Sequence, residues 1–240
     1  MLRNLSITLV EPEYPVNVWY VARLAKNFGV GRIYFIDPKV DLSAASIYAA
    51  HGADMLDRAE TTDFGRLRKI HDLLVATTAI RGKRKGNLVR RVMRPERAVR
   101  YIRSAKSPSL VLGRESTGLK NDEIRQCDVV TSIDTGTEYG TLNLSHALTI
   151  LLYLTSKTNS SKVRLQSRAV RELFALNLYE LAVSARFQKH RIDRLSEEVK
   201  RIALTSQSGE KEMLLMTGIF RKAVQTIREK NLRSQVRSKT

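Results

Sequence analysis

The stretches LVLGRESTGL, residues 110–119, and TLNLSHA, residues 141–147, decide the fold of this chain. In the first, an apolar run typical of a buried strand ends at Gly113, and charged and small polar residues follow. The second comes after another apolar run and a glycine-containing loop, and it opens an apolar helical stretch. Two strand ends that each lead into a glycine-bearing loop predict a ligand crevice at one edge of an open α/β sheet.

Short apolar runs alternate with helical patterns over the first two thirds of the chain. Strands are expected at Ile7–Val10, Arg32–Ile36, Asp72–Thr78, Leu110–Leu112 and Val129–Ile133. Helices are expected at Asn17–Phe28, Ala44–His51, Phe64–Ile70, Pro95–Ser104 and Leu142–Thr155. This alternation predicts an α/β fold with an open, mainly parallel sheet.

The composition changes near Thr155, where a polar, serine-rich and basic stretch follows that is typical of a linker. Beyond this stretch, amphipathic helical patterns cover Ala169–Arg186, Arg194–Thr205 and Lys211–Lys230. The sequence therefore predicts a sheet domain over residues 1–157, a linker over 158–168 and a small, basic, all-helical domain over 169–240.

The chain of 240 residues is strongly basic, with a net charge of +18 and a pI of about 10.3. A polyanionic partner is the first interpretation, because Lys and Arg neutralise phosphates and release counterions. Residues 161–240 hold 18 Lys and Arg against 8 Asp and Glu, so the predicted helical domain is the more basic part per residue. The helical domain is therefore expected to bind the substrate. An oligomerisation module with solvated outer faces is the alternative.

A second basic concentration is RGKRKGNLVRRVMR, residues 81–94, in which seven of fourteen residues are Lys or Arg. Two glycines favour a loop here over a helix. A basic loop at the carboxyl end of a strand is well placed to cover a polyanion, and the alternative is a plain surface insertion. The candidate polyanion-binding residues of this loop are Arg81, Lys83, Arg84, Lys85, Arg90 and Arg91.

Several classes of chemistry find no support in the sequence. The chain has no P-loop, no dinucleotide-binding glycine pattern after a strand and no nucleophile elbow. Its four histidines are not spaced as metal ligands, and its single cysteine, Cys127, allows neither a zinc site nor an internal disulfide, so we expect no metal and a reducing compartment. No apolar stretch of membrane-spanning length and no cleavable leader is recognisable, so no membrane association is expected.

Three segments, taken together, resemble the three motifs of the SPOUT (SpoU-type) RNA 2′-O-methyltransferases. They are NVWYVAR at residues 17–23, which LVEP precedes, LGRESTGL at 112–119 and TLNLSHA at 141–147. With the trailing basic helical domain they are most similar to the TrmJ branch of that family. The first motif departs from the commonest bacterial form in its turn but keeps the asparagine and the arginine, which favours an archaeal-type relative.

The resemblance implies a sheet with a deep trefoil knot at its C-terminal edge, a homodimer with the active site at the interface, and S-adenosylmethionine bound in the knot. It implies 2′-O-methylation of tRNA, at the ribose of nucleotide 32 in the anticodon loop. The cofactor pocket that it implies involves Thr77, Thr78, Ala79, Gly113, Ile133, Gly140, Thr141 and Leu142. For the glycines among these, simple turn geometry is an equally good explanation.

The same motifs imply the catalytic residues Arg23, Asn17, Glu115, Asn143 and Ser145. Arg23 is the family's catalytic arginine, and a grip on a phosphate beside the target ribose suits its permanently charged guanidinium better than a role as base. Asn17 is expected to orient Arg23 or the ribose, and Glu115 to fix an arginine or a loop amide. Asn143 and Ser145 either hold the hydroxyl or cap the following helix.

The second motif adds one more expectation, and two other functions stay open. Arg114 is expected to reach a phosphate of the RNA across the dimer.

The first alternative function is 2′-O-methylation of another tRNA or rRNA nucleotide. The second is a basic RNA-binding protein that has lost catalysis. In each case tRNA or another RNA is the partner, and a cytoplasmic location is expected.

Overall fold

The computed structural model describes residues 1–41, 52–79, 92–159, 163–206 and 208–237. Contacts divide the chain into two compact units, Met1–Val163 and Arg164–Thr240. The helix expected at Ala44–His51 and the candidate RNA-binding residues Arg81, Lys83, Arg84, Lys85, Arg90 and Arg91 lie outside the described residues.

The first unit is built on a six-stranded sheet in the order β3-β2-β1-β5-β4-β6, in which every neighbouring pair is parallel. The strands are β1 (Ser6–Val10), β2 (Arg32–Ile36), β3 (Glu60–Thr61), β4 (Leu73–Thr77), β5 (Pro108–Leu112) and β6 (Val129–Thr131). All five strands expected from the sequence are present, whereas β3, with two residues, was too short to give a pattern. The predicted parallel α/β sheet is therefore confirmed.

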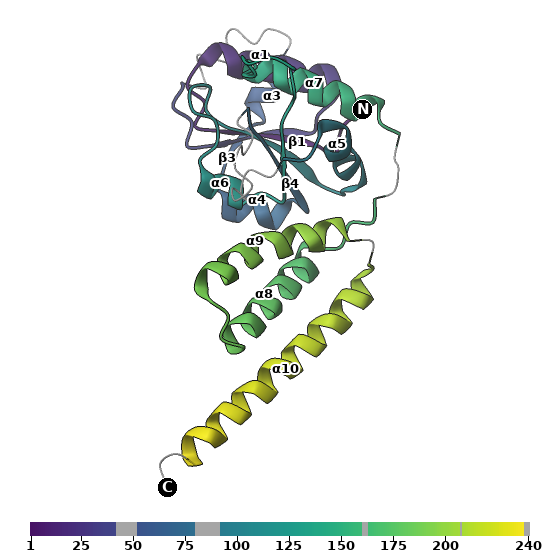
Figure 1. Ribbon diagram of the computed structural model, residues 1–240. Coiled ribbons are helices and arrows are strands. Elements are labelled where there is room, and N and C mark those ends of the chain that lie inside the picture. Colours follow the sequence, from purple (N-terminus) through teal and green to yellow (C-terminus); the bar gives the residue numbers. More distant parts are fainter. Residues whose placement is uncertain (42–51, 80–91, 160–162, 207, 238–240) are drawn as a thin grey trace. The chain divides into compact units, whose positions relative to one another are not determined.

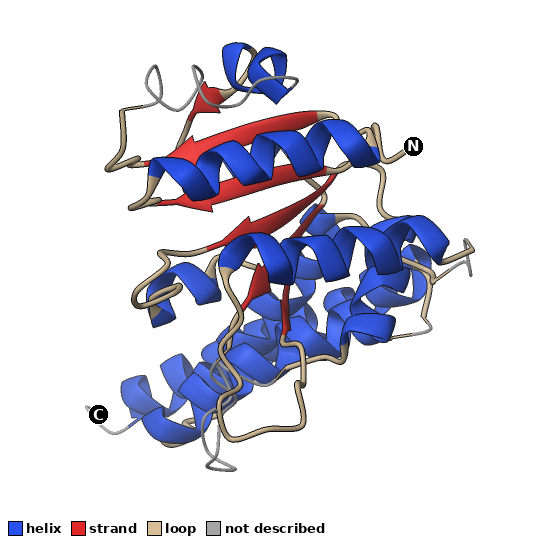
Figure 2. Cartoon of the chain, turned by 90° about the horizontal axis from the view of Figure 1, so that it is seen from above, coloured by secondary structure: helices blue, strands red, loops and turns tan. Residues whose placement is uncertain are grey.

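The helices of this unit are α1 (Pro15–Phe28), α3 (Ala53–Asp57), α4 (Phe64–Ile70), α5 (Pro95–Ser104), α6 (Asn121–Arg125) and α7 (Leu144–Lys157). Helix α7 packs against both α1 and α5 on one face of the sheet, and α4 and α6 lie on the other face (Figure 1). Figure 2 shows the strands side by side with long helices lying along them. The short helices α3 and α6 were missed by the periodicity, because five residues do not complete two turns.

The sheet is buried on both faces, as the continuous apolar runs in its strands require. One core cluster joins Val10, Leu74 and Val111 of the strands to Leu67 of α4 and Ile124 of α6. Because β4 leads into α5 on one face and β5 leads into α6 on the other, the chain diverges above the carboxyl ends of these neighbouring strands. Such a point of divergence is where open α/β sheets bind ligands.

The second unit contains three helices, α8 (Arg168–Ser184), α9 (Lys189–Thr205) and α10 (Glu210–Arg237). Its core joins Phe174 of α8 to Val199 and Ala203 of α9 and to Met213 of α10. All three helices were expected from the sequence. Helix α10 runs beyond its expected end at Lys230, because no Gly or Pro stops it there.

Candidate active site

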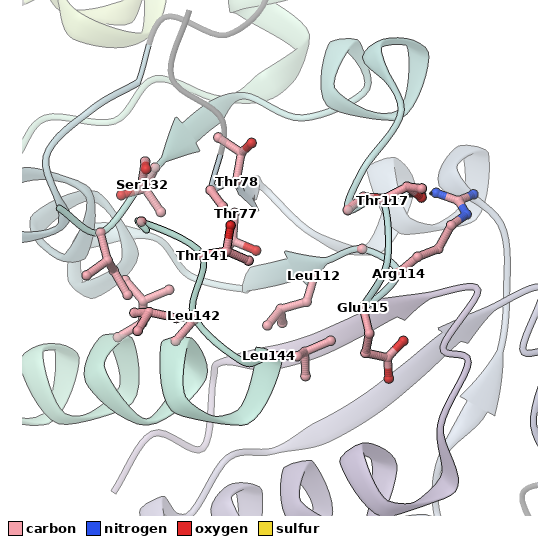
Figure 3. Close-up of a pocket in the computed structure, with 18 of the residues that line it drawn as sticks. Thr77, Thr78, Leu112, Arg114, Glu115, Thr117, Ser132, Thr141, Leu142 and Leu144 are labelled. Atoms are coloured by element: carbon pink, nitrogen blue, oxygen red, sulfur yellow. Dashed lines mark hydrogen bonds between the residues drawn. The ribbon is translucent and has the colours of Figure 1, made fainter. Parts of the chain in front are cut away.

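A cavity of about 190 Å³ opens at the carboxyl ends of β4, β5 and β6. It is lined by the residues that follow these three strands and by the first turns of α7 (Figure 3). All eight residues expected to bind the cofactor line it, namely Thr77, Thr78, Ala79, Gly113, Ile133, Gly140, Thr141 and Leu142. The sequence did not predict eight further lining residues, all of which except Leu151 lie within two positions of an expected site residue: Leu112, Ser116, Thr117, Thr131, Ser132, Leu144, Ala147 and Leu151.

The lining of this cavity is apolar and hydroxyl-bearing. Seven of its residues carry a hydroxyl group, from Thr77 to Thr141, and leucines complete the wall. Its two ionisable residues, Arg114 and Glu115, both bond within the protein. The described residues contain no group of three or more His, Cys, Asp or Glu that could hold a metal ion. The cavity therefore suits a hydrogen-bonding organic ligand with an apolar surface.

Gly113 is required by the packing of its own loop. A Cβ at this position would lie 2.3 Å from backbone atoms of Gly118 and Leu119, which real structures do not tolerate. Gly118 has a φ of +67°, a conformation that side chains disfavour, and it closes the turn by donating its N–H to the carbonyl of Arg114. Turn geometry thus accounts for both glycines, whereas a Cβ at Gly140 meets no atom closer than 3.9 Å.

Four of the five expected catalytic residues form one hydrogen-bonded network beside the cavity. The amide nitrogen of Asn17 donates to Oε1 of Glu115 over 2.9 Å, and the amide nitrogen of Asn143 donates to Oδ1 of Asn17 over 3.2 Å. Oδ1 of Asn143 accepts from both the backbone N–H and the hydroxyl of Ser145, at 2.8 and 2.7 Å. Asn143 therefore caps α7 and also belongs to the network, so the two interpretations of this residue hold together.

A reciprocal clamp holds the loops after β1 and β5 against each other. The backbone N–H of Glu13 donates to Oε2 of Glu115 over 2.9 Å, while the carboxylate of Glu13 accepts from the backbone N–H and hydroxyl of Ser116. Sequence reasoning missed Glu13, because its partner Glu115 lies about one hundred residues away. The clamp fixes the orientation of Glu115 at the rim of the cavity.

Arg23 stands apart from this network. It lies on the exposed side of α1, and its guanidinium carbon is 5.3 Å from the ring centroid of Trp19, a cation–π contact. Asn17, which was expected to orient Arg23, bonds to Glu115 and Asn143 instead. Arg23 therefore faces whatever approaches α1 from solvent.

Arg114, which was expected to reach RNA, lies in the interior, and this placement counts against that role. Its side chain is 6% exposed, and its guanidinium donates to Glu11, Glu123 and the carbonyl of Gly118. Figure 3 shows that the guanidinium lies away from Thr141. The two carboxylates, first that of Glu123, raise the pKa of Arg114, so the arginine ties the site loop to the loop after β1 and to α6 as a permanent cation.

The ion pair between Arg114 and Glu11 predicts how the stability of the protein depends on pH. The hydrogen bond from Arg114 lowers the pKa of Glu11 below its ordinary value of 4.5. A carboxyl group with a lowered pKa in the folded state contributes stability that is present above its unfolded pKa and is lost as the pH falls through its folded pKa. We expect Glu11→Gln to destabilise the protein near neutral pH, and the difference from wild type to shrink below about pH 4.5.

Urea unfolding of wild type and Glu11→Gln over a series of pH values measures this difference. Glu138→Gln, at an exposed position, serves as the matched control and should give no such narrowing. A difference between wild type and Glu11→Gln that stays constant with pH would contradict the stabilising charge on Glu11.

Comparison with known proteins places this site in a family. The sequence pattern of the SpoU rRNA methylase family matches residues 4–153. The tRNA (cytidine-2′-O-)-methyltransferase TrmJ of Sulfolobus acidocaldarius is 35% identical over 162 residues, which is 67% of this chain and 68% of that protein.

Solved structures agree on the fold. The crystal structure of TrmJ from Z. mobilis ZM4 superposes with a TM-score of 0.67 at 21% identity, over 90% of this chain and 97% of that one. The SpoU methyltransferase AviRb from Streptomyces viridochromogenes, solved in complex with AdoMet, superposes with a TM-score of 0.52 at 19% identity, over 65% of this chain and 61% of that one. On the match that spans most of the sheet unit, this chain belongs to the SpoU rRNA methylase family.

Proposed function

We propose that this chain is an S-adenosylmethionine-dependent methyltransferase that modifies the 2′-hydroxyl of a tRNA ribose. The observation that carries the proposal is the network of Asn17, Glu115, Asn143 and Ser145 at the rim of the cavity. Its members come from three segments far apart in the sequence, and a purely structural loop would not need them together. The archaeal relative named as a tRNA (cytidine-2′-O-)-methyltransferase supports the substrate.

The cavity fits the cofactor in its donor set. Hydroxyl and backbone groups after β4 and β6 offer hydrogen bonds to an adenosine, and Leu112, Ile133 and Leu142 offer apolar surface to its ring. The S-adenosylmethionine bound there supplies an activated methyl group. The family relative solved with AdoMet supports this cofactor.

The residues of this chain position the ribose. Glu115 is held by Asn17 and by the backbone of Glu13, so its carboxylate presents a fixed acceptor at the rim. Positioning of this kind lowers a barrier by ~7–11 kcal/mol in favourable cases. Arg23, exposed on α1, is the group that binds the phosphate next to the target ribose, because a guanidinium matches phosphate with two parallel hydrogen bonds.

The proposal also names the target nucleotide, which is the cytidine at position 32 of the anticodon loop. Mapping of 2′-O-methylated nucleotides in tRNA incubated with the purified protein and S-adenosylmethionine tests it. Methylation at position 32 supports the whole proposal, and methylation at another tRNA or rRNA nucleotide corrects the target. If the protein binds cofactor and RNA but methylates nothing, the conclusion is that it is an RNA-binding protein without catalysis. If methylation requires added zinc or magnesium, with RNA folding controlled, the metal-free mechanism is overturned.

A homodimer and a knotted C-terminal edge complete the proposal. Helices α1 and α7 pack on each other and carry exposed apolar side chains, with Val16 48% and Tyr20 43% exposed on α1, and Ile150 37% and Tyr153 54% exposed on α7. A second copy would cover this patch and would bring its own α1 near the first copy's site.

The described residues contain no helix able to cross a membrane. A tRNA substrate supports a cytoplasmic location.

We expect Ile150→Glu to convert the dimer into a monomer, because it places a charge in the apolar patch on α1 and α7. Light scattering after size-exclusion chromatography measures the mass. Ile219→Glu, at an exposed apolar position of α10, is the matched control and should leave the mass unchanged. A wild-type protein that is monomeric at the concentrations tested would refute the dimer, and an Ile150→Glu variant that remains dimeric would move the interface elsewhere.

A further inference from the structure

The solvent-facing side of α5 carries an uncompensated row of arginines. Arg97 and Arg100 are exposed and Arg103 is half-buried, while the opposite side of the helix is buried in the core. These three arginines make no ion pair with any described residue, although Glu96 lies one helical turn from Arg100. In other elements of the chain the arginines that pair with a carboxylate include Arg32, Arg58, Arg66, Arg125 and Arg201.

Helix α5 begins next to the cavity wall. The backbone N–H of Met93 donates to the carbonyl of Val130 over 2.7 Å, and the hydroxyl of Thr131 donates to the carbonyl of Met93 over 2.9 Å. Thr131 lines the cavity. The first turn of α5 is therefore anchored beside the site, and the arginine row runs away from it over ~9 Å from Arg97 to Arg103.

We propose that Arg97, Arg100 and Arg103 form a phosphate-binding face that receives the backbone of the RNA as it leaves the site. The inference rests on the proposed function, which it deepens by naming a contact surface. The unpaired guanidinium groups at the exposed positions Arg97 and Arg100 cost little in solvent, and they bind phosphate when the counterions of the RNA are released. The row begins near the cavity wall and leads away from it, along a path that an RNA whose ribose occupies the site would follow.

The test compares two charge-matched double variants in tRNA binding at several salt concentrations. Arg97→Gln/Arg100→Gln is expected to weaken binding about five- to tenfold at low salt and to flatten the salt slope by about 1.4–1.8, from two lost contacts. Arg3→Gln/Lys69→Gln removes the same charge at exposed positions near the amino-terminal ends of β1 and β4 and should change neither. Arg97→Lys/Arg100→Lys keeps both charges and should restore the salt slope.

The possible outcomes distinguish a failure of the phosphate-binding face from a failure of the proposed function. If wild type binds and methylates tRNA while the α5 variant behaves as the control does, the phosphate-binding face is refuted and the proposed function stands. If wild type neither binds nor methylates tRNA, the proposed function fails first. A third outcome is that Arg97→Gln/Arg100→Gln loses tRNA affinity together with cofactor affinity or thermal stability, and that Arg97→Lys/Arg100→Lys does not recover the salt slope. In that case the arginines are structural, and the inference is overturned.

A second and independent observation concerns Ser132 in the cavity wall (Figure 3). Its side chain is buried, with the residue 5% exposed, and its hydroxyl has no hydrogen-bond partner among the described residues. The neighbouring hydroxyl of Thr131 does have one, the carbonyl of Met93. A buried hydroxyl without a partner is costly, so a group that enters the cavity is the natural partner.

We infer that the hydroxyl of Ser132 hydrogen-bonds the bound cofactor, which again rests on the proposed function. Calorimetry with S-adenosylhomocysteine as the probe is expected to show about three- to tenfold weaker binding to Ser132→Ala, with no loss of thermal stability in the free protein. Ser109→Ala is the matched control, because Ser109 bonds to Thr8 inside the sheet. It should lose stability and keep its affinity.

The results again distinguish the alternatives. Unchanged affinity of Ser132→Ala, or a loss of stability in the free variant, would show that Ser132 has no role toward the ligand and would overturn the inference. Failure of the wild-type protein to bind S-adenosylhomocysteine would instead count against the proposed cofactor.

Discussion

Alanine in place of Arg23 is expected to lower the rate of methyl transfer to tRNA by about 10²–10³-fold, the usual cost of removing one group that stabilises the reacting centre. Affinity for the cofactor should stay near that of wild type, because Arg23 does not line the cavity and lies on the exposed side of α1. Single-turnover methylation and calorimetry with S-adenosylmethionine measure the two effects separately.

Two further variants sharpen this result. Arg23→Lys keeps the charge but loses the planar fork, so it should remain well below wild type if two hydrogen bonds to phosphate matter. Lys26→Ala, on the same helix, removes a surface charge that pairs with Asp54 and should leave turnover nearly intact. Normal turnover of Arg23→Ala would remove Arg23 from the active site, and a loss of cofactor affinity would place it in the cofactor pocket.

The sequence predicted the site well where the site is built from strand ends. Apolar runs that stop at Thr77, Leu112 and Thr131 are local signals, and parallel strands must bring such ends to one edge. The cap formed by Asn143 is local as well, since Oδ1 of Asn143 accepts from the backbone N–H of Ser145, whereas the bond from its amide nitrogen to Asn17 is a tertiary contact. Short-range patterns of this kind are sufficient to predict which loops meet.

The partners of the charged residues could not be predicted in the same way. Arg114 looks like an exposed basic residue in its sequence context, and only the approach of β1 to β5 brings Glu11 to it across about one hundred residues. Glu13 and Glu115 are joined by the same strand pairing. The sequence shows that these charges exist, but the tertiary contacts decide which are buried and paired and which, like Arg97, have no carboxylate partner in the described part of the chain.

The interior position of Arg114 leads to the largest stability effect that we expect. Arg114→Ala removes the shared partner of Glu11 and Glu123 and leaves two carboxylates that are each less than a quarter exposed. Breaking a buried ion pair in this way costs about 3–5 kcal/mol. For a domain of this size the melting temperature should fall by roughly 6–20 °C. Calorimetry of the cofactor-free protein measures it.

Arg125→Ala is the matched control, because Arg125 of α6 forms an exposed ion pair with Asp122 that is worth at most about 1 kcal/mol. Adding Glu11→Gln and Glu123→Gln to Arg114→Ala should recover part of the lost stability, since the two carboxylate charges that lost their shared partner are then gone. Below its melting transition the Arg114→Ala variant should bind tRNA with the salt slope of wild type. A stable Arg114→Ala protein with a flattened slope would mean that Arg114 leaves its carboxylates to bind phosphate, because only a direct contact with the RNA changes the number of counterions released.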